Sequence, residues 1–225
     1  MKLVTMENPL PAAEYESRQL VSDLFHQLSQ PLTTLCCSLE LAVLKTPTAD
    51  QFGEILGHAL TQAEKVSSLA TAIRELFDAS HAGEGVEALE LQRAVAEAVG
   101  DLLPVAESAG VQVCYLPGPA CRVWFDGQRL RQGLFHLIGF AIGSGGARVK
   151  IDLAERGAEA VLTLTVTPVA ACAGPSPVHS DQELLRRLGL GIARAIFEAA
   201  GGSLTVKRGA ESLSIAVKLL RSEAA

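Results

Sequence analysis

The sequence predicts an α+β fold in which a pair of long helices precedes one mixed sheet covered by further helices. Through residues 12–79, apolar side chains recur at three- and four-residue steps, which is the spacing of amphipathic helices. From residue 88 onward, helical stretches alternate with short runs rich in valine, leucine and threonine. Turn residues separate these runs, a pattern typical of an α/β sandwich.

The first helix is expected over residues 12–45 and carries a histidine on its polar face. Pro31 follows His26 by five residues; it removes the helix hydrogen bond to the carbonyl of Gln27 and should bend the helix. We therefore expect the imidazole of His26 to point toward solvent or a partner. The opposite, apolar face is made of leucines, namely Leu20, Leu24, Leu28, Leu32, Leu35 and Leu39.

A second helix is expected over residues 51–79, with Thr48 or Asp50 as its N-cap. A short loop joins the two helices, so they form an antiparallel hairpin over residues 12–80. Such a hairpin leaves much of its apolar surface uncovered, and pairing with a second copy buries that surface in a four-helix bundle. The sequence therefore predicts a homodimer.

The second domain is expected over residues 88–221, after a glycine-containing linker at residues 81–85. Its helices are predicted at residues 90–109, 126–142 and 182–200. Its strands are predicted at residues 111–115, 122–125, 149–153, 160–167, 203–206 and 212–219.

The composition excludes several classes of protein. The 225 residues carry a net charge of -6 without a basic block, which argues against binding to the phosphate backbone of nucleic acids. Five cysteines with no CxxC pair indicate neither disulfides nor a zinc site and fit a reducing cytoplasm. No apolar run reaches the roughly 18 residues of a membrane span, and no signal peptide is recognisable. We therefore expect a cytoplasmic protein.

The run FHQLSQPLT at residues 25–33 resembles the phosphoacceptor box of sensor histidine kinases, whose pattern is His-Glu/Asp-Leu-x-x-Pro-Leu. The resemblance extends over residues 12–220 and implies that His26 is the phosphoacceptor of a dimerisation and phosphotransfer hairpin, followed by a domain of the ATPase type. Gln27 replaces the acidic residue that accepts a proton from the imidazole; an amide can orient the ring but cannot act as that base. Gln30 occupies the position of a polar residue that takes part in phosphatase chemistry in the family.

Part of the nucleotide-binding pattern of that family is also present. The family has an Asp-x-x-Arg-Leu helix start followed by Asn-Leu-x-x-Asn-Ala, and residues 126–130 match the first element. His136 and Phe140 stand where the family has its two asparagines, the second of which holds magnesium. A phenylalanine offers no oxygen to a hard cation. The family's adenine-reading aspartate is missing after the strand at residues 160–167.

The last nucleotide box of the family, Gly-Leu-Gly-Leu-x-Ile, lies at a helix start, where free backbone N–H groups bind phosphate. In its counterpart at residues 187–192, Arg187 replaces one glycine, and Gly189 and Gly191 follow. These two glycines are either the remnant of a nucleotide-binding loop or ordinary packing glycines. The departures from the family pattern imply that binding of ATP and magnesium is lost and that no other metal or cofactor is held.

Three functions agree with this pattern. The first is a phosphoryl relay in two-component signalling, in which His26 exchanges a phosphoryl group with the receiver domain of a response regulator without using ATP. The second is a divergent but active ATP-dependent sensor histidine kinase, and the third is a non-catalytic dimeric scaffold or regulator that binds a receiver domain. We favour the relay because the chain retains the histidine and lacks the groups that ATP chemistry needs.

Overall fold

The computed structural model describes residues 12–44, 48–79, 83, 85–167, 180–209 and 211–222, with side chains described from residue 26 onward except for residues 27 and 180–182. The chain divides into two compact units, Met1–Thr71 and Ala72–Ala225. The division falls inside the second long helix, so the last two turns of that helix belong to the second unit. Among the described residues, no helix combines the length and the apolar character that crossing a bilayer requires.

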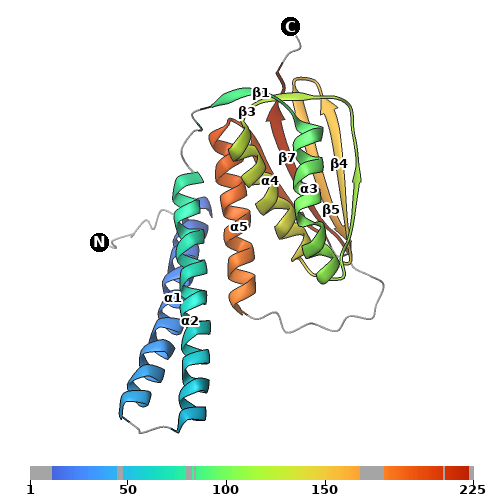
Figure 1. Cartoon of the computed structure of the whole chain (residues 1–225). Helices are drawn as coiled ribbons and strands as arrows, with labels where there is room; N and C mark the ends of the chain where they lie inside the picture. The colour runs from blue at the N-terminus through green and yellow to red at the C-terminus, as the bar shows by residue number, and fades with distance from the viewer. Residues whose placement is uncertain are drawn as a thin grey trace, which may run out of the picture. The chain divides into compact units, whose positions relative to one another are not determined.

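The first unit is the predicted hairpin of α1 (Ala12–Leu44) and α2 (Ala49–Ala79), which lie side by side in Figure 1. Helix α1 runs through Pro31 without interruption, and the proline itself is buried. The start of α2 is capped as predicted: the Thr48 hydroxyl accepts from the Gln51 N–H at 3.4 Å. In return, the Thr48 N–H donates to the Gln51 side chain at 3.1 Å, which completes a capping box.

The second unit packs three helices on one face of a five-stranded sheet (Figure 1). Strand β2 pairs with β4 in parallel, and the other pairs of the order β2-β4-β5-β7-β6 are antiparallel. The predicted mixed sheet and its α+β setting are confirmed. The helices are α3 (Leu91–Ser108), α4 (Gly127–Ile142) and α5 (Ser180–Ala199). The strands are β2 (Gln112–Leu116), β4 (Arg148–Arg156), β5 (Glu159–Thr167), β6 (Ser203–Arg208) and β7 (Leu213–Leu220).

A second, two-stranded sheet corrects the prediction of a single sheet. Strand β3 (Arg122–Asp126) pairs antiparallel with β1 (Val86–Glu90) and not with the strands of the larger sheet. Strand β1 was not predicted because its sequence, VEALE, consists mostly of good helix formers. Its pairing with β3, distant in the chain, overrides that local preference.

The core of the second unit lies between the helices and the larger sheet. The rings of Phe125 on β3 and Phe197 on α5 meet edge to face with their centroids 6.1 Å apart, so the small sheet is joined to the same core. The largest fully buried side chains include Leu130, Leu134, Ile138, Ile151, Leu162, Leu164, Ile192 and Ile215.

Candidate functional site

His26 lies on α1 with its side chain exposed, as the sequence predicts. The amide nitrogen of Gln30, one turn later, lies 3.4 Å from the ring nitrogen Nε2 of His26. An amide N–H can only donate, so as a hydrogen bond this contact places the imidazole lone pair on Nε2 and the proton on Nδ1. In that tautomer Nε2 is the nucleophilic nitrogen. The side chain of Gln27, the third predicted residue of this site, lies outside the described part of the chain.

Two hydroxyl groups that follow on α1 are engaged with the helix itself. The Thr33 hydroxyl donates to the carbonyl of Ser29 at 2.8 Å, and the Thr34 hydroxyl donates to the carbonyl of Gln30 at 3.0 Å. Such bonds to the preceding turn satisfy the hydroxyl groups locally. The described contact made to the ring of His26 is therefore that of the Gln30 amide.

In the second unit, the matched Asp-x-x-Arg-Leu element serves as a helix cap. Asp126 precedes α4, and its carboxylate accepts from the backbone N–H of Arg129 at 3.0 Å and from that of Gly85 at 3.2 Å. The hydrogen bond from Arg129 is the main cause that holds the pKa of Asp126 below its ordinary value. A carboxylate at this end of α4 also complements the helix dipole. This part of the family pattern therefore stabilises the fold.

Phe140, at the position of the family's magnesium-binding asparagine, is buried in the core with 6% of its surface exposed. The guanidinium carbon of Arg186 on α5 lies 5.1 Å from the centre of the Phe140 ring, in a cation–π arrangement. The same guanidinium pairs with Glu183, one turn earlier on α5, and the Arg186 side chain is only 15% exposed. A protein cation balanced by a protein carboxylate thus lies beside the residue at which the family places its metal ligand.

His136, at the position of the other asparagine, is half-buried as expected for a helix residue facing neighbouring elements. Its Nε2 lies 3.1 Å from a carboxylate oxygen of Glu75, near the end of α2. Burial lowers the pKa of His136, and the Glu75 carboxylate offsets part of that effect. The sequence could not identify Glu75 as a partner, because 61 residues separate the pair and no periodicity connects them.

Gly189 and Gly191 lie inside α5, which begins at Ser180, close to the helix predicted at residues 182–200. They do not lie at a helix start, where the family pattern has its glycine box. A backbone N–H inside a helix donates to the carbonyl four residues earlier, so it is not free to bind a phosphate. A Cβ placed on Gly189 would lie 3.4 Å from Nδ1 of His136, and one on Gly191 would lie 3.6 Å from Leu76. Both are ordinary van der Waals distances, so the packing around α5 leaves room for a Cβ at either position.

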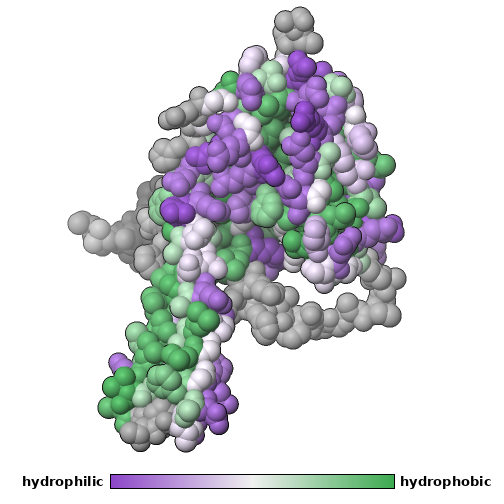
Figure 2. All heavy atoms as spheres, viewed as in Figure 1, coloured by the Kyte–Doolittle hydropathy of each residue, from purple (hydrophilic) through white to green (hydrophobic). Residues whose placement is uncertain are grey.

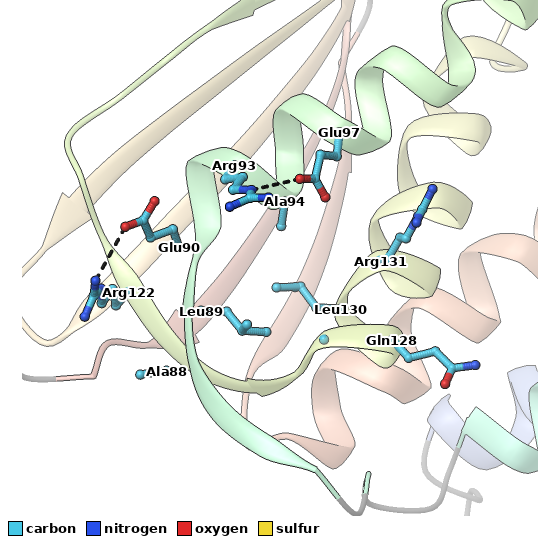
Figure 3. A pocket seen from close by; sticks show the side chains of 11 residues that line it. Ala88, Leu89, Glu90, Arg93, Ala94, Glu97, Arg122, Gln128, Leu130 and Arg131 are labelled. Atoms are coloured by element: carbon cyan, nitrogen blue, oxygen red, sulfur yellow. Dashed lines mark hydrogen bonds and ion pairs between the residues drawn. The ribbon is translucent and has the colours of Figure 1, made fainter.

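The pocket in Figure 3 lies elsewhere on the second unit, between β1, α3 and the start of α4, and has a volume of about 610 Å³. None of the predicted site residues lines it. Its three arginines each pair with a carboxylate, so positive charge is balanced around the rim. The pairs are Arg93 with Glu97 at 2.9 Å, Arg122 with Glu90 at 3.5 Å, and Arg131 with Asp101 at 2.7 Å.

The fold of this chain is similar to those of solved histidine kinase structures. The histidine kinase AdeS of Acinetobacter baumannii matches 88% of this chain over 98% of its own length, with a TM-score of 0.61 and 20% sequence identity. The chain has the fold of a histidine kinase core. Both parts of that prediction, the helical hairpin and the ATPase-like domain, are confirmed as architecture. No protein-family model and no curated protein matches the chain.

Two further histidine kinase structures have a similar fold. ThkA, solved in complex with the response regulator TrrA, matches 96% of this chain over 68% of its own, with a TM-score of 0.65 and 16% identity. Full-length ShkA, solved in complex with AMPPNP, matches 92% of this chain over 46% of its own, with a TM-score of 0.60 and 16% identity. At such identities the likeness concerns the fold, so the chemistry has to be argued from the residues.

Proposed function

We propose that this protein relays phosphoryl groups in two-component signalling: His26 receives them from the receiver domain of one response regulator and passes them to another, without using ATP. The observation that carries the proposal is the stack of Arg186 on Phe140. It combines a residue without metal-binding oxygens and a fixed protein cation at the position where a histidine kinase holds magnesium.

Phosphoryl transfer from ATP depends on electrostatic stabilisation of the phosphates by a metal ion. The carboxylate of Glu183 near Phe140 is paired with Arg186, and the guanidinium of Arg186 would repel a second cation. The backbone N–H groups of Gly189 and Gly191 are used inside α5. Each of these features argues against an active kinase, and none of them affects an acceptor histidine that lies on α1.

A relay places few demands on the protein. The lone pair on Nε2 of His26 attacks the phosphorus of an aspartyl phosphate; the new N–P bond forms, the P–O bond to the carboxylate breaks, and the carboxylate leaves with the electron pair. The proton on Nδ1 stays on the ring, so the step requires no base at Gln27. In the reverse direction, the carboxylate of a second receiver attacks the phosphorus and the imidazole leaves. The contact from Gln30 favours the tautomer that this exchange needs.

The proposal includes a receiver domain as partner and a second copy of the chain. The structure of ThkA bound to a response regulator supports a receiver as the kind of partner that this fold accepts. Apolar side chains gather on the hairpin in Figure 2, where a homodimer would bury them. The large apolar residues exposed on α1 and α2 of the first unit are Leu32, Leu39, Leu41, Val43, Leu44, Phe52, Leu56 and Leu60.

Transfer of label from phosphorylated receiver domains tests the relay directly. We expect the wild-type protein to acquire acid-labile phosphate, and His26→Ala to acquire none. His58→Ala is the matched control, since it removes another exposed histidine from the same hairpin and should leave transfer unchanged. If the wild type never becomes labelled but still binds the receivers, the protein is a scaffold and the relay is excluded.

Titration calorimetry with millimolar ATP and magnesium tests the second part of the proposal. We expect no heat of binding, because the residues that would hold the metal and the phosphates are replaced or engaged within the protein. Saturable, magnesium-dependent binding followed by labelling of His26 from ATP would contradict this part and identify an active kinase.

A further inference from the structure

The last two turns of α2, which belong to the second unit, are held against that unit by several kinds of contact. Ala79 is completely buried, and Leu76 packs against the core of the unit. The Arg129 side chain of α4 donates to the carbonyl of Asp78 at 2.8 Å, at the C-terminal end of the helix, where a cation is favourable. The end of α2 is therefore an integral element of the ATPase-like domain.

The contact between Glu75 and His136 differs from the others because it contains a group that titrates near neutral pH. The two side chains retain 34% and 20% of their exposure, and Nε2 lies 3.1 Å from the carboxylate. With a neutral imidazole, an Nε2–H donates to the charged Glu75 carboxylate, which is a charge-assisted hydrogen bond. The site is thus built to hold α2 on α4 while His136 is uncharged.

Among the described residues, Glu75 provides the charge that favours a positive imidazole at His136. On α5 the ring faces the backbone at Gly189. Arg186, one turn before Gly189, pairs with Glu183, and its guanidinium lies over Phe140, one turn beyond His136 on α4.

The remaining neighbours of His136 are also engaged. On α4 the rings of Phe135 and His136 lie nearly perpendicular to each other, with their centroids 6.0 Å apart. Of the two arginines on the same helix, Arg129 donates to the Asp78 carbonyl on α2 and Arg131 pairs with Asp101 on α3. Protonation of His136 therefore places a charge in a half-buried site, where the Glu75 carboxylate offsets only part of the cost of burial.

We propose that Glu75 and His136 form an acid-sensitive clasp, which holds the last two turns of α2 on α4 while the imidazole is neutral and releases them when it takes up a proton. The direction of the pH effect follows from the coupling between protonation of His136 and docking of α2. In the released state the imidazole is in water, whereas in the docked state burial lowers its pKa, so the released state binds the proton more tightly. Docking is strongest above the pKa of the free imidazole and weakens as the pH falls through it. This inference does not depend on phosphoryl transfer.

Hydrogen–deuterium exchange of residues 72–79 in the full chain, at pH 7.5 and 5.5 and corrected for intrinsic exchange rates, measures the clasp. We expect protection to fall at pH 5.5, by no more than about tenfold, because this pH lies about one unit below the pKa of the released imidazole. The fluorescence of Trp124, the one tryptophan of the chain, gives a second readout, because Trp124 and Ala79 line the same pocket.

Two substitutions predict opposite changes. His136→Gln keeps an N–H donor for Glu75 but does not titrate, so its protection should be the same at both pH values. Glu75→Gln removes the charge that stabilises the protonated ring, so its acid-induced loss of protection should exceed that of the wild type. His58→Gln, an exposed histidine elsewhere on α2, should respond like the wild type. Equal protection of the wild type at both pH values, or an unchanged acid response in His136→Gln, would overturn the proposal.

Discussion

Some residues of the family pattern support the fold of this protein, and others belong to the nucleotide chemistry. Asp126 is common to the family pattern and caps α4, so its position is a requirement of the fold. Phe140 departs from the pattern and fills the core, and Arg186 packs on it. The sequence identified the loss of the asparagine oxygen at Phe140. It could not identify Arg186 as the neighbour, because only the tertiary packing of α5 against α4 brings the two side chains together.

Removal of the Asp126 carboxylate should weaken the second unit. Asp126→Ala leaves the N–H groups of Arg129 and Gly85 without their described acceptor, and loss of an N-cap costs about 1 kcal/mol of the free energy of unfolding. Asp126→Asn keeps an oxygen acceptor and should lose much less. Urea denaturation of the three proteins measures the difference; equal midpoints for Asp126→Ala and the wild type would contradict the capping role.

The same carboxylate gives the stability a pH dependence. Because the pKa of Asp126 is lower in the folded protein than in the unfolded chain, its contribution is fully present above the unfolded value of about 3.9. The contribution disappears as the pH falls through the folded pKa. Acid denaturation followed by circular dichroism should therefore show a smaller loss between pH 5 and 2 in Asp126→Asn than in the wild type.

At the scale of elements, the sequence predicts those helices and strands that have a clear hydrophobic periodicity. The two long helices and the β4–β5 hairpin were found within a few residues, because alternation or helical spacing runs through each of them. Strand β1 was missed because its residues favour helix and its partner β3 lies far along the chain. Helix α5 begins within two residues of the predicted start at residue 182, so the local sequence places Gly189 and Gly191 inside the helix, whereas the family pattern has its glycine box at a helix start.

Gly83 and Gly85, which precede β1, allow a test of how closely this segment packs on Asp126; Gly85 serves as the control for Gly83. A Cβ on Gly83 would lie 2.5 Å from Cβ of Asp126, whereas one on Gly85 would lie 3.6 Å from the nearest atom of that residue. Gly83→Ala should therefore destabilise the second unit by about 1–3 kcal/mol, the usual range for overpacking. Gly85→Ala retains the N–H that Asp126 accepts and should be close to neutral. Thermal denaturation compares the pair, and equal melting temperatures would show that the approach to Gly83 relaxes without cost.

For the whole molecule, the order of the motifs was enough to predict two parts and their type. The division inside α2 was not predictable, because α2 is one continuous helical pattern and the contacts of Glu75, Leu76 and Ala79 come from the second unit. Contacts between distant segments decide where a compact unit ends, and sequence periodicity carries no information about them.

The apolar surface of the hairpin makes the oligomeric state of the whole molecule testable. Leu56 and Leu60 on α2 are 48% and 61% exposed in the single chain, and a homodimeric bundle would cover them. The double substitution Leu56→Asp and Leu60→Asp would bury two carboxylates at that interface. It should therefore convert a dimer into a monomer in sedimentation equilibrium.

Thr61→Asp is the matched control, because its side chain is exposed and projects about 100° around the helix from Leu60. This variant should sediment like the wild type. The wild type should also unfold at a higher temperature as its concentration rises, since association stabilises the folded state by mass action, and the double variant should lose that dependence. A wild-type protein that remains monomeric at high concentration would assign the exposed leucines to another partner, with the receiver domain as the first to be tested by the same substitutions.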